Sequence, residues 1–162
     1  MKGKLFAVSG PSGVGKNTVL NSVVQQRERV QYSISATSRP MRPGEVDGKS
    51  YYFVTRAQFE TMIENGVGAL NSKKRLPEAV LVFLTAPSLA EIRRRLEKRG
   101  DVSPEAMEKR MERAKWEYSQ AYQYDYLVVN DTVGHAAAEL LAIMTAEKCK
   151  MMDRIHCIKE EL

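Results

Sequence analysis

The sequence predicts an α/β fold in which helices flank a parallel sheet. A short apolar run at residues 5–8 is followed at once by a glycine-rich loop and then by a stretch with helical periodicity. A second apolar run, residues 80–84, is uninterrupted, as is typical of a strand buried on both faces. Strands that alternate with helices in this way form parallel sheets, and 162 residues suffice for one domain with its own core.

Each element of the first half follows from a local pattern. The first strand, residues 5–9, is expected to be buried, and the helix behind the loop, residues 18–26, to pack through its apolar side. Apolar and polar residues alternate over residues 30–34, which predicts a half-exposed strand. A turn-rich stretch then leads to another strand, residues 51–54, and helical periodicity returns near Phe59.

Capping residues define the elements of the second half. Ser88 is placed to cap the helix that follows the second apolar run, and Gly100 to end it. Ser103 and Pro104 have the pattern of a fresh helix start. A last strand is expected at residues 126–129, followed by one long helix to the C-terminus.

The cysteines bear on where the protein works. Cys149 and Cys157 fall on the predicted C-terminal helix, about 12 Å apart along its axis, which is beyond disulfide reach. Free thiols suit a reducing compartment, so a cytoplasmic location is expected. No apolar run approaches the length of a membrane span or of a secretory signal, and we expect no membrane partner. The sequence does not specify an oligomeric state.

The glycine-rich loop has the Gly-x4-Gly-Lys spacing of a phosphate-binding loop. Backbone N–H groups in such a loop turn inward around an anion, and the following helix adds its positive end. Lys16 supplies a mobile charge for the β- and γ-phosphate oxygens of a nucleoside polyphosphate. A glycine-rich turn that binds nothing is the alternative, and the flanking strand and helix disfavour it. The predicted phosphate-binding residues are Gly10, Pro11, Ser12, Gly13, Val14, Gly15, Lys16, Asn17 and Thr18.

A magnesium ion is expected to accompany the phosphates. A hydroxyl just beyond the lysine of such a loop usually serves Mg²⁺. In this chain Asn17 follows the lysine directly and Thr18 comes one step later. Thr18 is the predicted metal ligand because of its hydroxyl, and Asn17 is the open alternative.

Arginines are concentrated at two further places. The net charge of +5 suits nucleic acid and equally suits a pocket that neutralises several phosphates; because the arginines cluster, we favour the pocket and expect no nucleic-acid partner. Arg39 and Arg42 flank a proline-stiffened turn close to Ser35 and Tyr51. Two guanidinium groups on a rigid turn are suited to binding a phosphate. The alternative is a basic loop that only faces solvent, and the spacing alone fits both interpretations equally well.

The second cluster lies on either side of Gly100. Arg95, Arg99 and Arg110 belong to a helix–break–helix segment that could close as a lid over phosphate groups. On the residues alone, a charged helix face paired with neighbouring glutamates is slightly favoured. The candidate partners are Glu97, Glu105, Glu108 and Glu112.

Together these segments resemble the guanylate kinase family, whose members move the γ-phosphoryl group of ATP onto GMP. The loop from Ser9 to Lys16 is close to the family form, and residues 33–54 resemble the family's GMP-binding signature. The resemblance spans nearly the whole chain. It implies a P-loop NTPase-type parallel sheet flanked by helices, a small β-containing GMP-binding lobe and a helical lid.

The resemblance also implies roles for individual residues and a division of the chain. The implied GMP-binding residues are Ser35, Arg39, Arg42, Glu45 and Tyr51. Besides the loop, the implied ATP-binding residues are Arg95 and Asn130. The implied catalytic residues are Lys16, Arg42, Arg99 and Arg110. The implied parts of this single domain are a core (residues 1–32, 68–92 and 124–162), the lobe (33–67) and the lid (93–123).

One departure from the family pattern follows Gly66. The family continues there with the rest of its GMP lobe, an acidic residue that reads guanine, and a sheet strand that ends in another acid. This chain passes directly to Val67, so we expect an internal segment to be missing between Gly66 and Val67 and only three parallel strands to remain.

The function that the resemblance implies is the ATP-dependent phosphorylation of GMP to GDP, with ATP and GMP as substrates and Mg²⁺ bound with ATP. Another nucleoside monophosphate kinase is one alternative, because a phosphate grip does not depend on the base. A non-catalytic guanylate-kinase-like binding module is the other. Such modules typically lose the loop lysine, and Lys16 is present.

Overall fold

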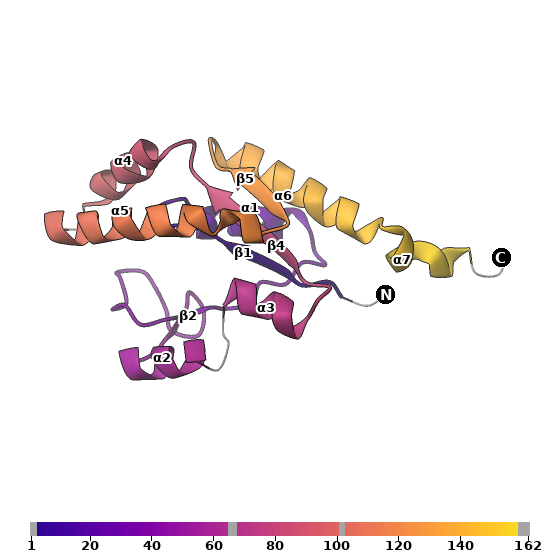
Figure 1. Ribbon diagram of the computed structural model, residues 1–162, viewed down its shortest axis with the longest axis horizontal. Coiled ribbons are helices and arrows are strands. Elements are labelled where there is room, and N and C mark those ends of the chain that lie inside the picture. The colour runs from indigo at the N-terminus through magenta and orange to yellow at the C-terminus, as the bar shows by residue number, and fades with distance from the viewer. Residues whose placement is uncertain (1–2, 65–67, 101–102, 159–162) are drawn as a thin grey trace.

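A three-stranded parallel sheet forms the centre of the computed structural model, which describes residues 3–64, 68–100 and 103–158 (Figure 1). The strand order is β1 (Phe6–Ser9), β4 (Val80–Thr85) and β5 (Tyr126–Val129). The central strand β4 is buried along its whole length, as its uninterrupted apolar run predicts. Every residue of β1 is only half-buried. The prediction of a buried first strand is wrong because β1 is an edge strand with a partner on one side only.

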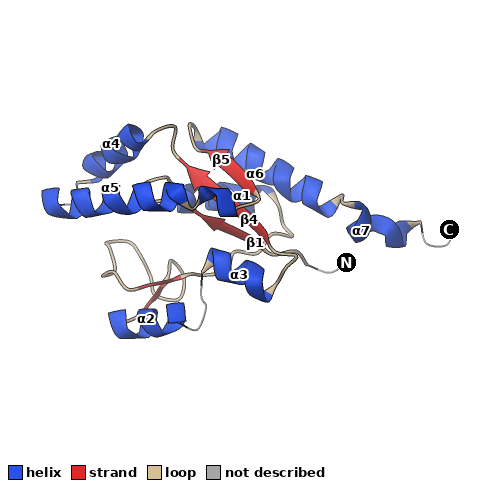
Figure 2. Cartoon of the chain, in the orientation of Figure 1, coloured by secondary structure: helices blue, strands red, loops and turns tan. Residues whose placement is uncertain are grey.

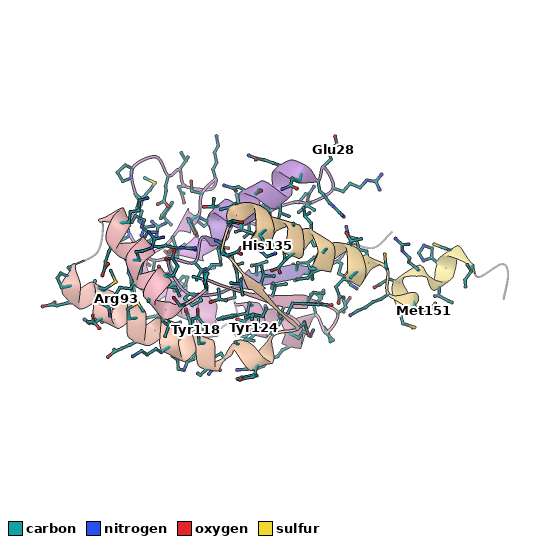
Figure 3. The ribbon with its side chains drawn as sticks, turned by 90° about the horizontal axis from the view of Figure 1, so that it is seen from above. Glu28, Arg93, Tyr118, Tyr124, His135 and Met151 are labelled. Atoms are coloured by element: carbon teal, nitrogen blue, oxygen red, sulfur yellow. The ribbon has the colours of Figure 1, made fainter. Side chains whose placement is uncertain are left out.

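Alternate residues of β4 face two different layers. Val80, Val82 and Leu84 join the apolar core together with residues of α1 (Lys16–Gln26) and α6 (Val133–Lys148), which pack against each other. On the other face, Phe83 makes edge-on ring contacts with Tyr118 and Tyr124. Both tyrosines are labelled in Figure 3. The short helix α3 (Ala69–Arg75) contacts β1 and β4.

A small lobe lies beside the sheet (Figures 1 and 2). It contains the two-residue strands β2 (Ala36–Thr37) and β3 (Tyr52–Phe53), which pair in parallel, and the helix α2 (Arg56–Glu64). The predicted strand over residues 30–34 is wrong. A turn at residues 28–29, closed by the Val30 N–H donating to the Arg27 carbonyl at 3.1 Å, precedes this region, and residues 30–35 have no regular structure. Strand β3 pairs only with residues 36–37.

The caps predicted from sequence are confirmed on both helices of the segment around Gly100. Helix α4 (Leu89–Arg99) begins with the Ser88 hydroxyl accepting from the Glu91 N–H and ends at Gly100 with a φ of 70°. Helix α5 (Pro104–Ser119) begins with the Ser103 hydroxyl accepting from the Ala106 N–H. A 3₁₀ turn, Ala121–Gln123, then leads into β5.

The C-terminal region differs from the single long helix predicted. Helix α6 ends at Lys148, and α7 (Met151–Arg154) and a 3₁₀ turn (Ile155–Cys157) follow it and extend past the body of the domain (Figure 1). Cys149 therefore lies in the break after α6 and Cys157 in the last 3₁₀ turn, and both are free and exposed. Within the described residues, no helix has the length and apolar character that a membrane span requires.

Candidate nucleotide-binding site

The phosphate-binding loop lies between the carboxyl end of β1 and the first turn of α1. Gly10 has a φ of 149°, and a Cβ there would stand 1.9 Å from the Leu84 carbonyl oxygen of β4. Gly15 has a φ of 89°, and a Cβ there would stand 2.6 Å from the side-chain amide of Asn130. These contacts explain why only glycine fits at both positions.

Lys16 is folded back onto its own loop. Its ammonium group donates a hydrogen bond to the Gly10 carbonyl oxygen. Burial lowers the pKa of Lys16, and the nearby Glu117 carboxylate opposes that shift. A desolvated cation is costly unless it is paired with an anion. The loop is therefore arranged so that a bound phosphate would stabilise the charged lysine.

The remaining loop residues divide into buried and exposed ones. Pro11 and Val14 are buried and can offer a ligand only their backbone groups. Ser12, Asn17 and Thr18 are exposed. Exposure of the Thr18 side chain at the first turn of α1 leaves its hydroxyl accessible from solvent.

Asn130 and Arg95 brace the loop from outside. Asn130 is buried at the end of β5, and its Nδ2 donates to the Val14 carbonyl at 2.7 Å. Arg95 Nη2 donates to the Asn130 carbonyl at 2.9 Å, while its Nε pairs with Glu91 Oε1 at 2.7 Å. The structure thus places both predicted ATP-binding residues against the loop backbone, where they fix its shape.

A second group of charged residues sits on the turn between β2 and β3. Arg39 binds Glu45 with two parallel hydrogen bonds of 2.7 and 2.5 Å, and the Arg42 backbone N–H donates to the same carboxylate at 2.8 Å. The Arg39 hydrogen bonds, helped by the Arg42 N–H and opposed by burial, lower the pKa of Glu45 to about 2. Glu45 therefore stabilises the turn that presents both arginines. Ser35 is exposed, and its carbonyl accepts from the Tyr52 N–H at 2.9 Å.

The loop and this turn are in direct contact. The Asn17 side-chain amide donates to the Tyr51 hydroxyl oxygen at 2.8 Å. The Arg39 guanidinium carbon lies 5.1 Å from the centroid of the Tyr51 ring. The structure therefore places Tyr51 between the phosphate loop and the arginine turn.

Helices α4 and α5 carry some arginines that pair with glutamates and one that has an unpartnered nitrogen among the described residues. Glu108, one of the candidate glutamate partners, pairs at 2.9 Å with Arg93, which is not one of the three arginines predicted for the lid (Arg93 is labelled in Figure 3). Arg110 differs, because its Nη1 is buried and has no hydrogen-bond partner among the described residues. Arg99 lies exposed at the end of α4.

Glu117 is a candidate that sequence reasoning missed. Its Oε2 is buried and unpartnered within the described part of the chain, and its Oε1 accepts from Arg113 at 3.3 Å. It lines a cavity of about 220 Å³ that Ser9, at the end of β1, also lines. Glu117 follows Arg110 by seven residues, two turns along α5, so helical spacing could have found it.

The fold and the site define a P-loop nucleotide-binding protein: a glycine-rich loop closes around a lysine at the carboxyl end of a parallel sheet. A family model described as guanylate kinase matches residues 2–68 and 65–147. The guanylate kinase of a Thermus thermophilus strain is 45% identical over 184 residues, which cover 91% of this chain and 83% of that protein. The chain belongs to the guanylate kinase family.

A further relative and a solved structure are also guanylate kinases. The guanylate kinase of Desulfitobacterium hafniense is 38% identical over 185 residues, covering 92% of each chain. The crystal structure of guanylate kinase from Anaplasma phagocytophilum superposes with a TM-score of 0.68 at 26% identity, covering 91% of this chain and 87% of that one. These similarities confirm the resemblance and the α/β fold class.

The comparisons also bear on the expected missing segment. The two regions matched by the family model meet at residues 65–68, and the alignment of 184 residues is longer than this 162-residue chain. Relatives therefore carry residues that have no counterpart here. The junction of Gly66 and Val67 itself lies outside the described residues. The sheet has the three parallel strands expected.

Proposed function

We propose that this chain transfers the γ-phosphoryl group of ATP to GMP, forming ADP and GDP. The observation that carries the proposal is the hydrogen bond between Asn17 and Tyr51. It joins a loop built for a nucleoside triphosphate to a turn that presents two arginines, so that a donor and an acceptor phosphate would lie side by side. Positioning of this kind is the main requirement of in-line phosphoryl transfer.

In this mechanism the loop N–H groups and Lys16 hold the β- and γ-phosphates of ATP. The acceptor phosphate binds Arg39, Arg42, Ser35 and Tyr51. Glu45 supports the acceptor site by holding Arg39 and the backbone of Arg42. No covalent enzyme intermediate is required.

The lid contributes Arg99 and Arg110. The Nη1 of Arg110 supports this role, because a buried guanidinium nitrogen that has no acceptor among the described residues is suited to a phosphate oxygen. Charge that develops on the transferring group would be stabilised by both arginines while the lid excludes water.

The residues present also fit Mg²⁺. Thr18 offers an accessible hydroxyl, and Glu117 offers a buried carboxylate oxygen that has no partner among the described residues. The Asn17 amide is engaged with Tyr51, which favours Thr18 as the ligand. When bound with ATP, the metal neutralises charge on the β- and γ-phosphates.

We also propose the division of the chain into a core, a lobe over residues 33–67 and a lid over residues 93–123, and a cytoplasmic location. The separate two-stranded unit formed by β2 and β3 supports the lobe. The helix–break–helix geometry at Gly100 supports the lid. The free thiols of Cys149 and Cys157 suit a reducing compartment.

The preference for guanine is inferred from membership of the family, so the experiment compares four nucleoside monophosphates as acceptors. Release of ADP from ATP is measured with GMP, AMP, CMP and UMP in turn. The proposal expects turnover with GMP above the other three. A preference for AMP would instead identify another nucleoside monophosphate kinase, and tight ATP binding without turnover would identify a binding module.

A further inference from the structure

The residue directly after the phosphate-loop lysine makes its hydrogen bond away from the loop. Asn17 belongs to the first turn of α1, and its Nδ2 donates to the Tyr51 hydroxyl at 2.8 Å. We propose that Asn17 is a positioning residue for the acceptor phosphate and that it acts through Tyr51. This inference rests on the function proposed above and adds a role for the Asn17 side chain within it.

The chemistry of the hydroxyl group explains what Asn17 contributes. A tyrosine hydroxyl has one proton to donate and two lone pairs that accept. Because the Asn17 amide occupies a lone pair, the Tyr51 proton stays available for a phosphate oxygen. Donation into the oxygen also polarises the O–H bond and strengthens the hydrogen bond that it makes in turn. Asn17 therefore keeps Tyr51 oriented as a donor before the acceptor arrives.

The Tyr51 ring is held from its other side by the arginine turn. The Arg39 guanidinium carbon lies 5.1 Å from the ring centroid, and Arg39 is fixed by its paired bonds to Glu45. The Phe53 ring packs edge-on against Tyr51 at 6.0 Å between centroids. With its ring fixed in this way, Tyr51 accepts from the Asn17 amide with its hydroxyl oxygen and keeps its proton for a phosphate.

The same contact connects the acceptor lobe to α1. A series of direct contacts runs from Asn17 to Tyr51, from Tyr51 to Arg39 and from Arg39 to Glu45. Truncating Asn17 should therefore weaken binding of the acceptor phosphate. The backbone N–H of Asn17, which serves the ATP phosphates in the proposed site, would be unchanged by that truncation.

The test measures the dissociation constant of GMP by calorimetry, without ATP, for four proteins: wild type, Asn17→Ala, Tyr51→Phe and the double variant. Loss of one hydrogen bond predicts GMP binding about threefold to tenfold weaker for Asn17→Ala. The double variant should bind GMP no more weakly than Tyr51→Phe alone, because Asn17 acts through the hydroxyl.

Three controls separate this role from a general loss of structure. Asn17→Ala should leave the affinity for guanosine, which lacks the phosphate, and the affinity for ATP unchanged to within about twofold. Asn21→Ala, an exposed asparagine one turn later on α1, should leave GMP binding at the wild-type value.

The possible outcomes have distinct meanings. Losses that add in the double variant, or equal losses for GMP and guanosine, would overturn the role assigned to Asn17. A wild-type chain that binds ATP but no GMP would overturn the proposed function, and the inference with it. Non-additive losses confined to GMP would support both.

Discussion

The side-chain amide of Asn130 donates to the Val14 carbonyl at 2.7 Å and lies 2.6 Å from the place a Cβ on Gly15 would occupy. One buried side chain at the end of β5 therefore fixes both a carbonyl and a glycine of the phosphate loop. The contact links residues 116 positions apart in the sequence. It makes the shape of the loop depend on the far edge of the sheet.

Replacing Asn130 should loosen that loop. Asn130→Ala leaves the Val14 carbonyl with only the longer hydrogen bond from Arg95 Nη1, at 3.4 Å, so the loss of the Asn130 bond costs about 1 kcal/mol in the free energy of unfolding. Urea denaturation measures this loss, and calorimetry should show weaker ATP binding in the same variant. Asn21→Ala, which removes an exposed amide, should change neither quantity. Wild-type ATP affinity in Asn130→Ala would contradict the bracing role.

Lys16→Ala should greatly slow phosphoryl transfer while leaving the protein folded. Loss of a preorganised charge at the transferring group predicts a fall in kcat of about a hundredfold to a thousandfold. The free energy of unfolding without nucleotide should not decrease, because burial of the Lys16 ammonium is itself unfavourable. Steady-state kinetics and urea denaturation give the two values. Transfer at the wild-type rate would exclude Lys16 from the mechanism.

Arg42→Ala should act mainly on the acceptor. Loss of a charged phosphate contact predicts a KM for GMP raised by about tenfold or more, with the KM for ATP little changed. Initial rates with each substrate varied in turn separate the two constants. Arg29→Ala, which removes an exposed arginine outside the lobe, is the matched control for loss of charge. Unchanged GMP kinetics in Arg42→Ala would place the acceptor site elsewhere.

Glu147 should make the stability of the fold pH-dependent. Its carboxylate is buried and binds Lys150 and Lys4, at 2.6 and 3.2 Å, and the Tyr126 hydroxyl, at 2.7 Å. Burial raises the pKa of Glu147, but these hydrogen bonds outweigh burial and hold the pKa at about 2. Because this folded pKa is below the ordinary value of 4.5, the stabilisation is complete above about pH 4.5 and is lost as the pH falls toward 2.

The variant Glu147→Gln tests this dependence. Breaking a buried ion pair predicts a loss of about 3 kcal/mol in the free energy of unfolding near pH 7. The difference from wild type should shrink as the pH falls from about 4.5 toward 2, because over that range the Glu147 carboxylate of the unfolded chain binds a proton while that of the folded protein stays ionised. Chemical denaturation at a series of pH values measures it. A difference that stays constant down to pH 2 would show that Glu147 contributes by packing and not by charge.

The parts of the fold that sequence predicted correctly are those set by local signals. The Ser88 and Ser103 caps and the end of α4 at Gly100 depend on neighbours a few residues away, and each is where its pattern predicts. The half-buried state of β1 depends instead on which strands are present beside it. The break after α6 carries no proline or glycine; there Lys4, from the start of the chain, binds both Glu147 and Asp153.

In the candidate site, too, local sequence signals predicted some features, and contacts between distant segments determined the others. Lys16 could be predicted from spacing, because the glycine and lysine positions encode its loop. The role of the arginine turn needed the resemblance to the family as well, since a solvated basic loop has the same spacing. The contacts of Asn17 with Tyr51 and of Asn130 with Val14 could not be predicted, since each joins segments that are distant in sequence. The seven-residue spacing on one helix could have predicted that Glu117 lies on the same face as Arg110. The burial of the unpartnered Glu117 oxygen could not be predicted, because it is a property of the packed structure.

We propose that this chain, with its shortened acceptor lobe, moves a phosphoryl group from ATP to GMP. Phosphorus NMR of the purified protein with ATP, GMP and Mg²⁺ follows every phosphate directly, with Lys16→Ala as the blank. GDP and ADP should appear in equal amounts, and neither should form when GMP is left out. ATP that stays intact in the presence of bound GMP, or that is hydrolysed to inorganic phosphate without GDP, would contradict this proposal.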